Sequence, residues 1–148
     1  MKDCIFCKIV KGEIPSYKIW ESEDYIAVLD IYPNIRGQTL VIPKRHISSY
    51  AFGLEDDVLV HFIKTTKKVA NLLEKKLPVQ RVHLVLEGVM VSHLHAKLFP
   101  AIGFDEFIVP EPPDGVFYSA YPRFVTSLPG PKAKEEDLRV LQKQLTEK

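Results

Sequence analysis

Two histidines and a lysine stand at alternate positions in "VSHLHAKLFP", which covers residues 91–100. Side chains alternate between the two faces of a strand, so His93, His95 and Lys97 would share one face, and the apolar residues between them would face a core. Two imidazoles and an ammonium group are too polar to bury without partners. The stretch is therefore either a functional site or the solvent-exposed polar face of an edge strand.

Metal binding is suggested by "CIFC", in which Cys4 and Cys7 have the C-x2-C spacing of metal ligands. His46, in "IPKRHI", directly follows a predicted strand. These three residues and one histidine of the later pair would make a Cys2His2 set, the usual tetrahedral complement of zinc. The histidine spacing is not that of a zinc finger, so the site would be assembled from distant segments. The alternative is an ordinary pair of buried thiols.

Composition limits the class of protein. The chain has 148 residues, of which 46% are hydrophobic and 26% charged, so it can form one compact domain with a core. A net charge of +1 gives no indication of a nucleic-acid or membrane partner. No apolar run approaches the roughly 18 residues that span a bilayer, and "MKDCIFCKIV" does not resemble a signal peptide. We expect a cytoplasmic protein, where a C-x2-C pair is more often a metal or redox pair than a disulfide.

The elements that would position these residues follow from apolar spacing and turn residues. Apolar or small residues recur at helical intervals between Glu55 and Leu77, and Pro78 ends the run. The order of these segments contains no regular strand–helix–strand crossovers, which favours an α+β fold with an antiparallel sheet of about five strands. The expected order is a short helix from residue 4 to near residue 12, strands at 17–21, 24–30 and 38–43, a long helix over 55–77, and strands at 81–87 and 91–99, joined by a short turn at Gly88.

The C-terminal part differs in composition. Six of the eleven prolines lie between residues 110 and 131. We expect residues 1–104 to form the folded domain and residues 105–148 to form a proline-rich arm with a short helix at 134–145, packed on the same domain.

Together these segments resemble the histidine triad (HIT) family, whose motif is His-φ-His-φ-His-φ-φ with φ apolar. Here the motif reads His93-Leu-His95-Ala-Lys97-Leu-Phe99. The stretch "CIFCKIVKGEIPSYKIWESEDYIAVLDIYPNIRGQTLVIPKRHI" is similar to the family's N-terminal half. The resemblance covers roughly residues 4 to 104 and implies a HIT-like fold and a homodimer.

The resemblance implies a role for each matching residue. His95 would be the nucleophile that attacks the α-phosphorus of a nucleotide, through a covalent nucleotidyl-histidine. Asp30 would bind the ribose hydroxyls, and Gly88 would lie among the nucleotide-binding residues. The base pocket would be formed by Ile5, Phe6, Ile9 and Ile31, and a structural zinc would be bound by Cys4, Cys7, His46 and His93.

Several positions depart from the family. Lys97 replaces the third histidine, where its ammonium would bind a phosphate oxygen as a point charge, or would simply be solvated. Val89 and Met90 stand where polar phosphate ligands are expected, Leu86 stands where asparagine is usual, and Gln38 stands near a position often held by histidine. These changes bear on whether the site is catalytic.

The expected function is that of a nucleotide hydrolase or nucleotidyl transferase, similar to a nucleotide phosphoramidase or dinucleoside polyphosphate hydrolase, acting on a purine nucleotide. Two alternatives stay open. One is a catalytically weak nucleotide-binding protein, favoured by the apolar residues in phosphate-ligand positions. The other is a zinc-stabilised interaction protein that works through its proline-rich arm.

Overall fold

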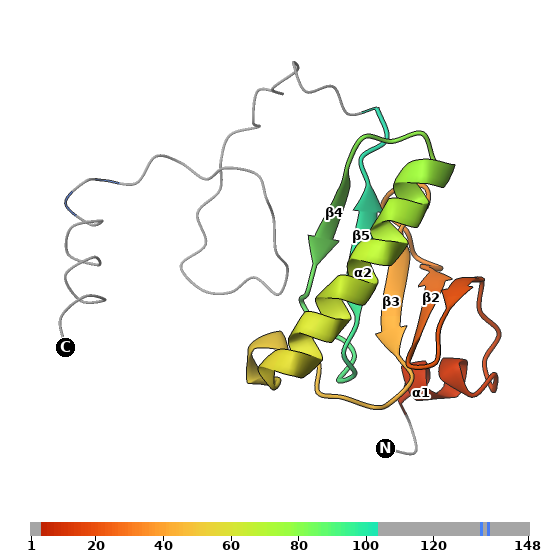
Figure 1. Cartoon of the computed structure of the whole chain (residues 1–148), viewed down its shortest axis with the longest axis vertical. Coiled ribbons are helices and arrows are strands. Elements are labelled where there is room, and N and C mark those ends of the chain that lie inside the picture. Colours follow the sequence, from red (N-terminus) through yellow and green to blue (C-terminus); the bar gives the residue numbers. More distant parts are fainter. Residues whose placement is uncertain (1–3, 104–133, 135, 137–148) are drawn as a thin grey trace. The chain divides into compact units, whose positions relative to one another are not determined.

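The computed structural model describes residues 4–103, 134 and 136. Its helices and strands belong to Met1–Glu106, the first of two compact units. The expected arm and terminal helix lie outside the described residues, apart from residues 134 and 136. No helix in the described part is long and apolar enough to cross a membrane. In chain order the elements are α1 (Ile5–Val10), β1 (Lys18–Glu21), β2 (Tyr25–Leu29), β3 (Thr39–Pro43), the 3-10 helix η1 (Ala51–Gly53), α2 (Asp56–Lys76), β4 (Val82–Val85) and β5 (Ala96–Pro100) (Figure 1).

The five strands form one sheet in the order β1-β2-β3-β5-β4, and every neighbouring pair is antiparallel. The chain passes through α2 and β4 before β5 inserts between β3 and β4, where Leu40 lies opposite Lys97 and Val41 opposite Ala96. This arrangement confirms the α+β class and the antiparallel sheet. It also brings the end of β3 close to the segment that leads into β5, although the two are far apart in the sequence.

Alternating residues of β2 pack into different clusters, so the sheet is covered on both faces. Tyr25 and Ala27 belong to the cluster that includes Phe62 of α2. Ile26 and Val28 belong to the cluster that includes Phe6 of α1. Helix α2 therefore packs on one face of the sheet, as Figure 1 shows, and α1 packs on the other.

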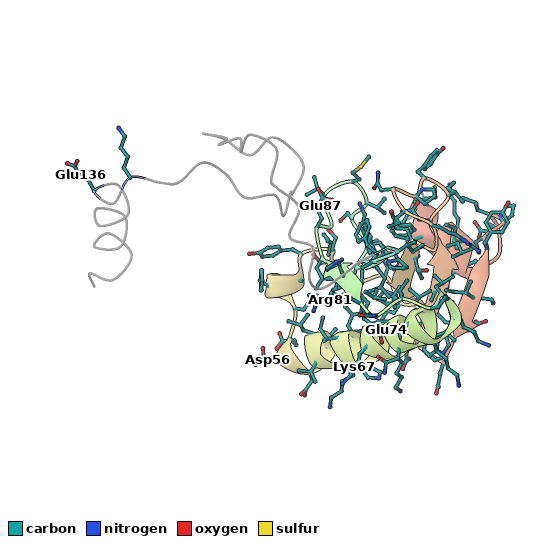
Figure 2. All side chains as sticks on the ribbon, turned by 90° about the horizontal axis from the view of Figure 1, so that it is seen from above. Asp56, Lys67, Glu74, Arg81, Glu87 and Glu136 are labelled. Atoms are coloured by element: carbon teal, nitrogen blue, oxygen red, sulfur yellow. The ribbon has the colours of Figure 1, made fainter. Side chains whose placement is uncertain are left out.

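The long helix forms where its apolar spacing predicts. Acidic residues stand in its first turn, and Lys75 and Lys76 stand in its last, which suits the helix dipole. Its buried residues are those that meet the sheet, whereas Asp56 and Lys67 are exposed and point from α2 into the surroundings (Figure 2). Leu77 ends the helix just before Pro78, as expected.

The expected strand at 91–99 is only partly formed, because β5 begins at Ala96. The backbone N–H groups before it donate to other partners. The His93 N–H donates to the Val91 carbonyl, and the Leu94 N–H donates to the carbonyl of Ile47, which lies beyond β3. A segment of ten residues, 86–95, thus joins β4 to β5 in place of a short turn. The interpretation of the histidines as an exposed edge-strand face is wrong, since β5 is an interior strand and both histidines are buried.

Candidate functional site

Two cysteines and two histidines converge at one end of the sheet, on the α1 side. Cys4 caps α1 and Cys7 lies in its first turn, so their thiols share one side of the helix. His46 follows β3, and His93 lies in the segment that leads into β5. One ligand atom from each residue can be chosen so that all lie within 4.8 Å of one another. The four residues lie close enough to bind one metal ion.

His93 is oriented by a carbonyl group. Its Nε2 lies 2.9 Å from the Pro43 carbonyl oxygen, which can only accept, so Nε2 carries the hydrogen. Nδ1 is then the nitrogen with the lone pair, and it lies 3.3 Å from Cys4 Sγ and 3.5 Å from Cys7 Sγ. Bonds of zinc length in a tetrahedron place ligand atoms about 3.3–3.8 Å apart. The donor set and its spacing therefore fit zinc.

The thiols are not in a disulfide. Cys4 and Cys7 are free cysteines, and Cys7 Sγ also lies 3.4 Å from His46 Nδ1. Desolvation and the neighbouring Cys4 raise the pKa of the Cys7 thiol. A cation bound between the thiols would favour their thiolate forms and release protons on binding.

His95 is oriented in the opposite sense to His93. Its Nδ1 lies 2.7 Å from the His93 carbonyl oxygen, so Nδ1 donates and Nε2 keeps the lone pair. Burial lowers the pKa of His95, and Lys97 lowers it further, while the carbonyl contact and the charges of Glu87 and Asp30 act in the other direction. His95 as a whole residue is 5% exposed. The arrangement favours a neutral imidazole whose Nε2 can act as a nucleophile.

Phe6 packs its ring edge-to-face against His95, with centroids 4.9 Å apart, and also contacts His93. This contact restrains both imidazoles, so Phe6 is a wall of the histidine site as well as part of the core beneath α1.

Lys97 is a partly buried residue with an acidic partner. It lies on β5, on the sheet face opposite α2, next to Leu40. Its Nζ is 3.5 Å from Glu87 Oε2, and the two side chains are only 26% and 16% exposed. Glu87 follows β4 (Figure 2). The interpretation of Lys97 as a fully solvated lysine is therefore wrong.

Asp30 lies at the end of β2 and is fixed by two hydrogen bonds. Its Oδ1 accepts from the Tyr32 N–H at 2.9 Å, and its Oδ2 accepts from Gln38 Nε2 at 2.6 Å. Its negative charge acts to raise the pKa of His95. The predicted ribose ligand thus lies within electrostatic range of the predicted nucleophile.

The other predicted nucleotide-binding residues differ in exposure. Ile5 and Ile31 are exposed at 45% and 64%, whereas Ile9 is half-buried beside the core under α1. Gly88 has a φ of +65°, and a Cβ there would lie 2.5 Å from the Ser49 carbonyl oxygen. Only glycine suits this position, because both the backbone angle and the close approach exclude a side chain.

Sequence reasoning missed the partners of three site residues. Glu87 pairs with Lys97, the Pro43 carbonyl orients His93, and Gln38 holds Asp30. The sequence gives no local signal of such contacts. Glu87 is a lone glutamate before a glycine, and Pro43 is a proline at the end of a strand. In the sequence, Gln38 stands out only as a departure from the usual histidine.

The HIT domain family model matches residues 11–102, well over half of the chain, and the chain therefore belongs to the HIT family. An uncharacterized HIT-like protein of Methanocaldococcus jannaschii is 40% identical over 111 residues, which cover 72% of this chain and 84% of that protein. An adenosine 5'-monophosphoramidase of Candida albicans is 36% identical over 106 residues, which cover 66% of this chain and 69% of that enzyme.

Solved structures of similar proteins have the same fold. A Streptococcus mutans protein superposes with a TM-score of 0.68 and 31% identity, covering 98% of this chain and 84% of its own. A Zn-bound histidine triad family protein from Mycobacterium smegmatis superposes with a TM-score of 0.60 and 27% identity, covering 76% of this chain and 85% of its own.

Proposed function

We propose that the chain is a nucleotide hydrolase or nucleotidyl transferase that acts at the α-phosphate of a purine nucleotide through His95. The observation that carries this proposal is the bond from His95 Nδ1 to the His93 carbonyl, because it leaves Nε2 with the lone pair. Similarity to an adenosine 5'-monophosphoramidase supports both the reaction class and the purine base.

In the proposed reaction, Nε2 of His95 attacks the α-phosphorus while the bond to the leaving group breaks with its electron pair. The leaving group is an amine, an alcohol or a phosphate, and it takes up a proton. Water then attacks the nucleotidyl-histidine, the phosphorus–nitrogen bond breaks, and its electron pair returns to Nε2. Water loses one proton, and a nucleoside monophosphate is released. A different acceptor in place of water would make the reaction a transfer.

The nucleotide would be bound by the residues around His95. Asp30 would accept hydrogen bonds from the ribose hydroxyls, and the ammonium of Lys97 would contact a phosphate oxygen. Gly88 would belong to the nucleotide-binding segment after β4, which it allows to pass close to Ser49. The base would lie against the apolar side chains of Ile5, Phe6, Ile9 and Ile31.

A substrate panel tests the proposed function. The full-length protein would be incubated with adenosine phosphoramidate, a dinucleoside polyphosphate and their guanosine counterparts, and release of nucleoside monophosphate would be measured. We expect turnover of at least one of them. Absence of both turnover and nucleotide binding would reject the proposal.

A catalytically weak nucleotide-binding protein is the second candidate. Val89 and Met90 are 57% and 88% exposed in the segment between β4 and β5, so they offer apolar surface where phosphate ligands are expected. In the same panel, saturable binding without turnover would select this candidate over the first. An interaction protein working through its arm would depend on residues 105–133, outside the described residues.

We propose that the four-residue cluster binds one structural zinc, in a reducing compartment such as the cytoplasm. Four protein ligands leave no open position on the metal, so the ion would stabilise the junction of α1, β3 and the segment before β5. Elemental analysis is expected to find about one zinc per chain, and a strong chelator is expected to lower the melting temperature by several degrees or more.

Two histidine variants sharpen the zinc prediction. His46→Ala should lower both the zinc content and the melting temperature, whereas His83→Ala, at an exposed position on β4, should leave the zinc content unchanged. Protein purified without added metal that contains no zinc, iron or similar ion would contradict the proposal.

We also propose a homodimer formed by the β4 edge and the adjoining helix. Leu84 on β4 and Val60 and Ile63 on α2 are exposed at 42%, 49% and 37%. Ile63 also lines a cavity shared with the exposed aromatic residues Tyr50 and Phe52 of the η1 region. Among residues 4–103, β4 is an edge strand with β5 as its one neighbour, and such an edge beside exposed apolar side chains is the kind of surface that a second copy would cover.

Light scattering after size exclusion is expected to give twice the chain mass of 16.9 kDa. Ile63→Glu would place a charge in the proposed interface and should yield the monomer. Tyr17→Lys, at an exposed position before the opposite edge strand, should leave the dimer intact. A monomeric wild-type protein at micromolar concentration would refute this surface as a stable interface.

A further inference from the structure

We infer that Gln38 is a positioning residue, which fixes the Asp30 carboxylate so that the site selects ribonucleotides over 2′-deoxyribonucleotides. This inference rests on the proposed function, because it requires a nucleotide in the site. Gln38 is 3% exposed and directly precedes β3. A buried amide at this place needs specific partners, and the hydrogen bonds of Gln38 lead to Asp30 or to the loop that follows it.

The two residues are joined through both backbone and side chain. The Asp30 N–H donates to the Gln38 carbonyl at 3.0 Å, which extends the pairing of β2 with β3 beyond the strand ends. Gln38 Nε2 donates to Asp30 Oδ2 at 2.6 Å, and Gln38 Oε1 accepts from the Asn34 N–H at 2.7 Å. The amide therefore bridges the carboxylate and the backbone of the loop after it.

The orientation of the amide is fixed by the chemistry of these partners. A backbone N–H can only donate and an ionised carboxylate can only accept, so a flipped amide would lose both bonds. Glutamine is also uncharged at every physiological pH. An imidazole could make the same two bonds in only one neutral tautomer, and it would lose the acceptor on protonation. Gln38 thus holds Asp30 in one orientation regardless of pH.

The remaining acceptor capacity of Asp30 suits a diol. A carboxylate has about four lone-pair sites. The Tyr32 N–H uses one site on Oδ1, and Gln38 uses one site on Oδ2. One site per oxygen is left on a side chain that is partly exposed. Two adjacent hydroxyls, such as those of ribose, could each donate to one oxygen. Without Gln38 only the Tyr32 N–H would hold the carboxylate, so Oδ2 would be less well positioned and the second hydroxyl would gain less from it.

The test is a comparison of AMP and 2′-deoxyAMP binding to the full chain by calorimetry. The wild-type protein is expected to prefer AMP roughly ten- to a hundred-fold, the value of one hydrogen bond to a charged group. Gln38→Ala should reduce this preference to about threefold or less, with little change in the affinity for 2′-deoxyAMP. Gln38→Glu, which keeps the shape but removes the donor, should do the same. Gln80→Ala, at an exposed position before β4, is the matched control.

A purely structural role would lower the affinity for both nucleotides together and leave their ratio unchanged. In an Asp30→Asn background, Gln38→Ala should have no further effect on the ratio, because Gln38 acts through the carboxylate. The inference is overturned if the Gln38 variants keep the wild-type preference, or if the wild-type protein binds both nucleotides equally. If the wild-type protein binds neither, the proposed function itself fails, and the inference fails with it.

Discussion

Replacement of His95 by alanine is expected to abolish turnover, with a loss on the order of a thousand-fold or more. A loss of this size follows from removing a covalent nucleophile, because no other group then forms the first bond to phosphorus. His95 does not belong to the metal cluster, and Asp30 and Lys97 remain in place. Nucleotide affinity should therefore change far less than turnover. The measurement is the release of nucleoside monophosphate alongside calorimetric binding of the product.

Trapping the covalent nucleotidyl-histidine would test the same prediction independently. Wild-type protein quenched in alkaline denaturant during turnover should carry one nucleoside monophosphate by intact mass, and His95→Ala should carry none. His83→Ala is the matched control, since His83 is exposed on β4 and should leave both turnover and adduct unchanged. A His95→Ala rate near the wild-type rate would place the chemistry elsewhere.

The regular elements could be predicted because their signals are local. The apolar spacing of α2 and the apolar run of β2 are set by how each element meets the core, and the ends of both elements were predicted to within a residue or two. The start of β5 at Ala96 could not be predicted in this way. The residues before it have strand-like alternation, but the Leu94 N–H bonds to Ile47, a residue far away in the sequence.

The candidate site was predictable in its residue types more than in its contacts. The two cysteines, His46 and His93 were expected to converge, and the ligand distances confirm that they do. The C-x2-C spacing alone left open which later histidine would join them. That choice depends on the Pro43 carbonyl, which turns His93 Nδ1 toward the thiols. Such an orienting contact exists only once β3 and the segment before β5 lie side by side.

Lys97→Met is expected to lower the catalytic rate by about ten- to a thousand-fold, in line with losing one transition-state donor. Methionine keeps the apolar stem and removes the charge. Negative charge on the phosphate oxygens builds up as the bond to His95 forms, so the loss should fall on turnover more than on binding. Lys97→His should recover part of the rate, but only part, because Val89 and Met90 remain apolar. Lys67→Met, an exposed lysine on α2, is the control.

The Glu87 contact requires a further variant. Lys97→Met takes the ammonium away from a carboxylate that is only 16% exposed, so the single variant can also lose stability. The double variant Lys97→Met/Glu87→Gln removes both charges, and its melting temperature should return toward that of the wild-type protein. If Lys97 contacts the phosphate, turnover of the double variant should stay low while stability recovers. If turnover recovers together with stability, the lysine serves only the ion pair, and the phosphate must be bound by other groups, such as backbone N–H donors.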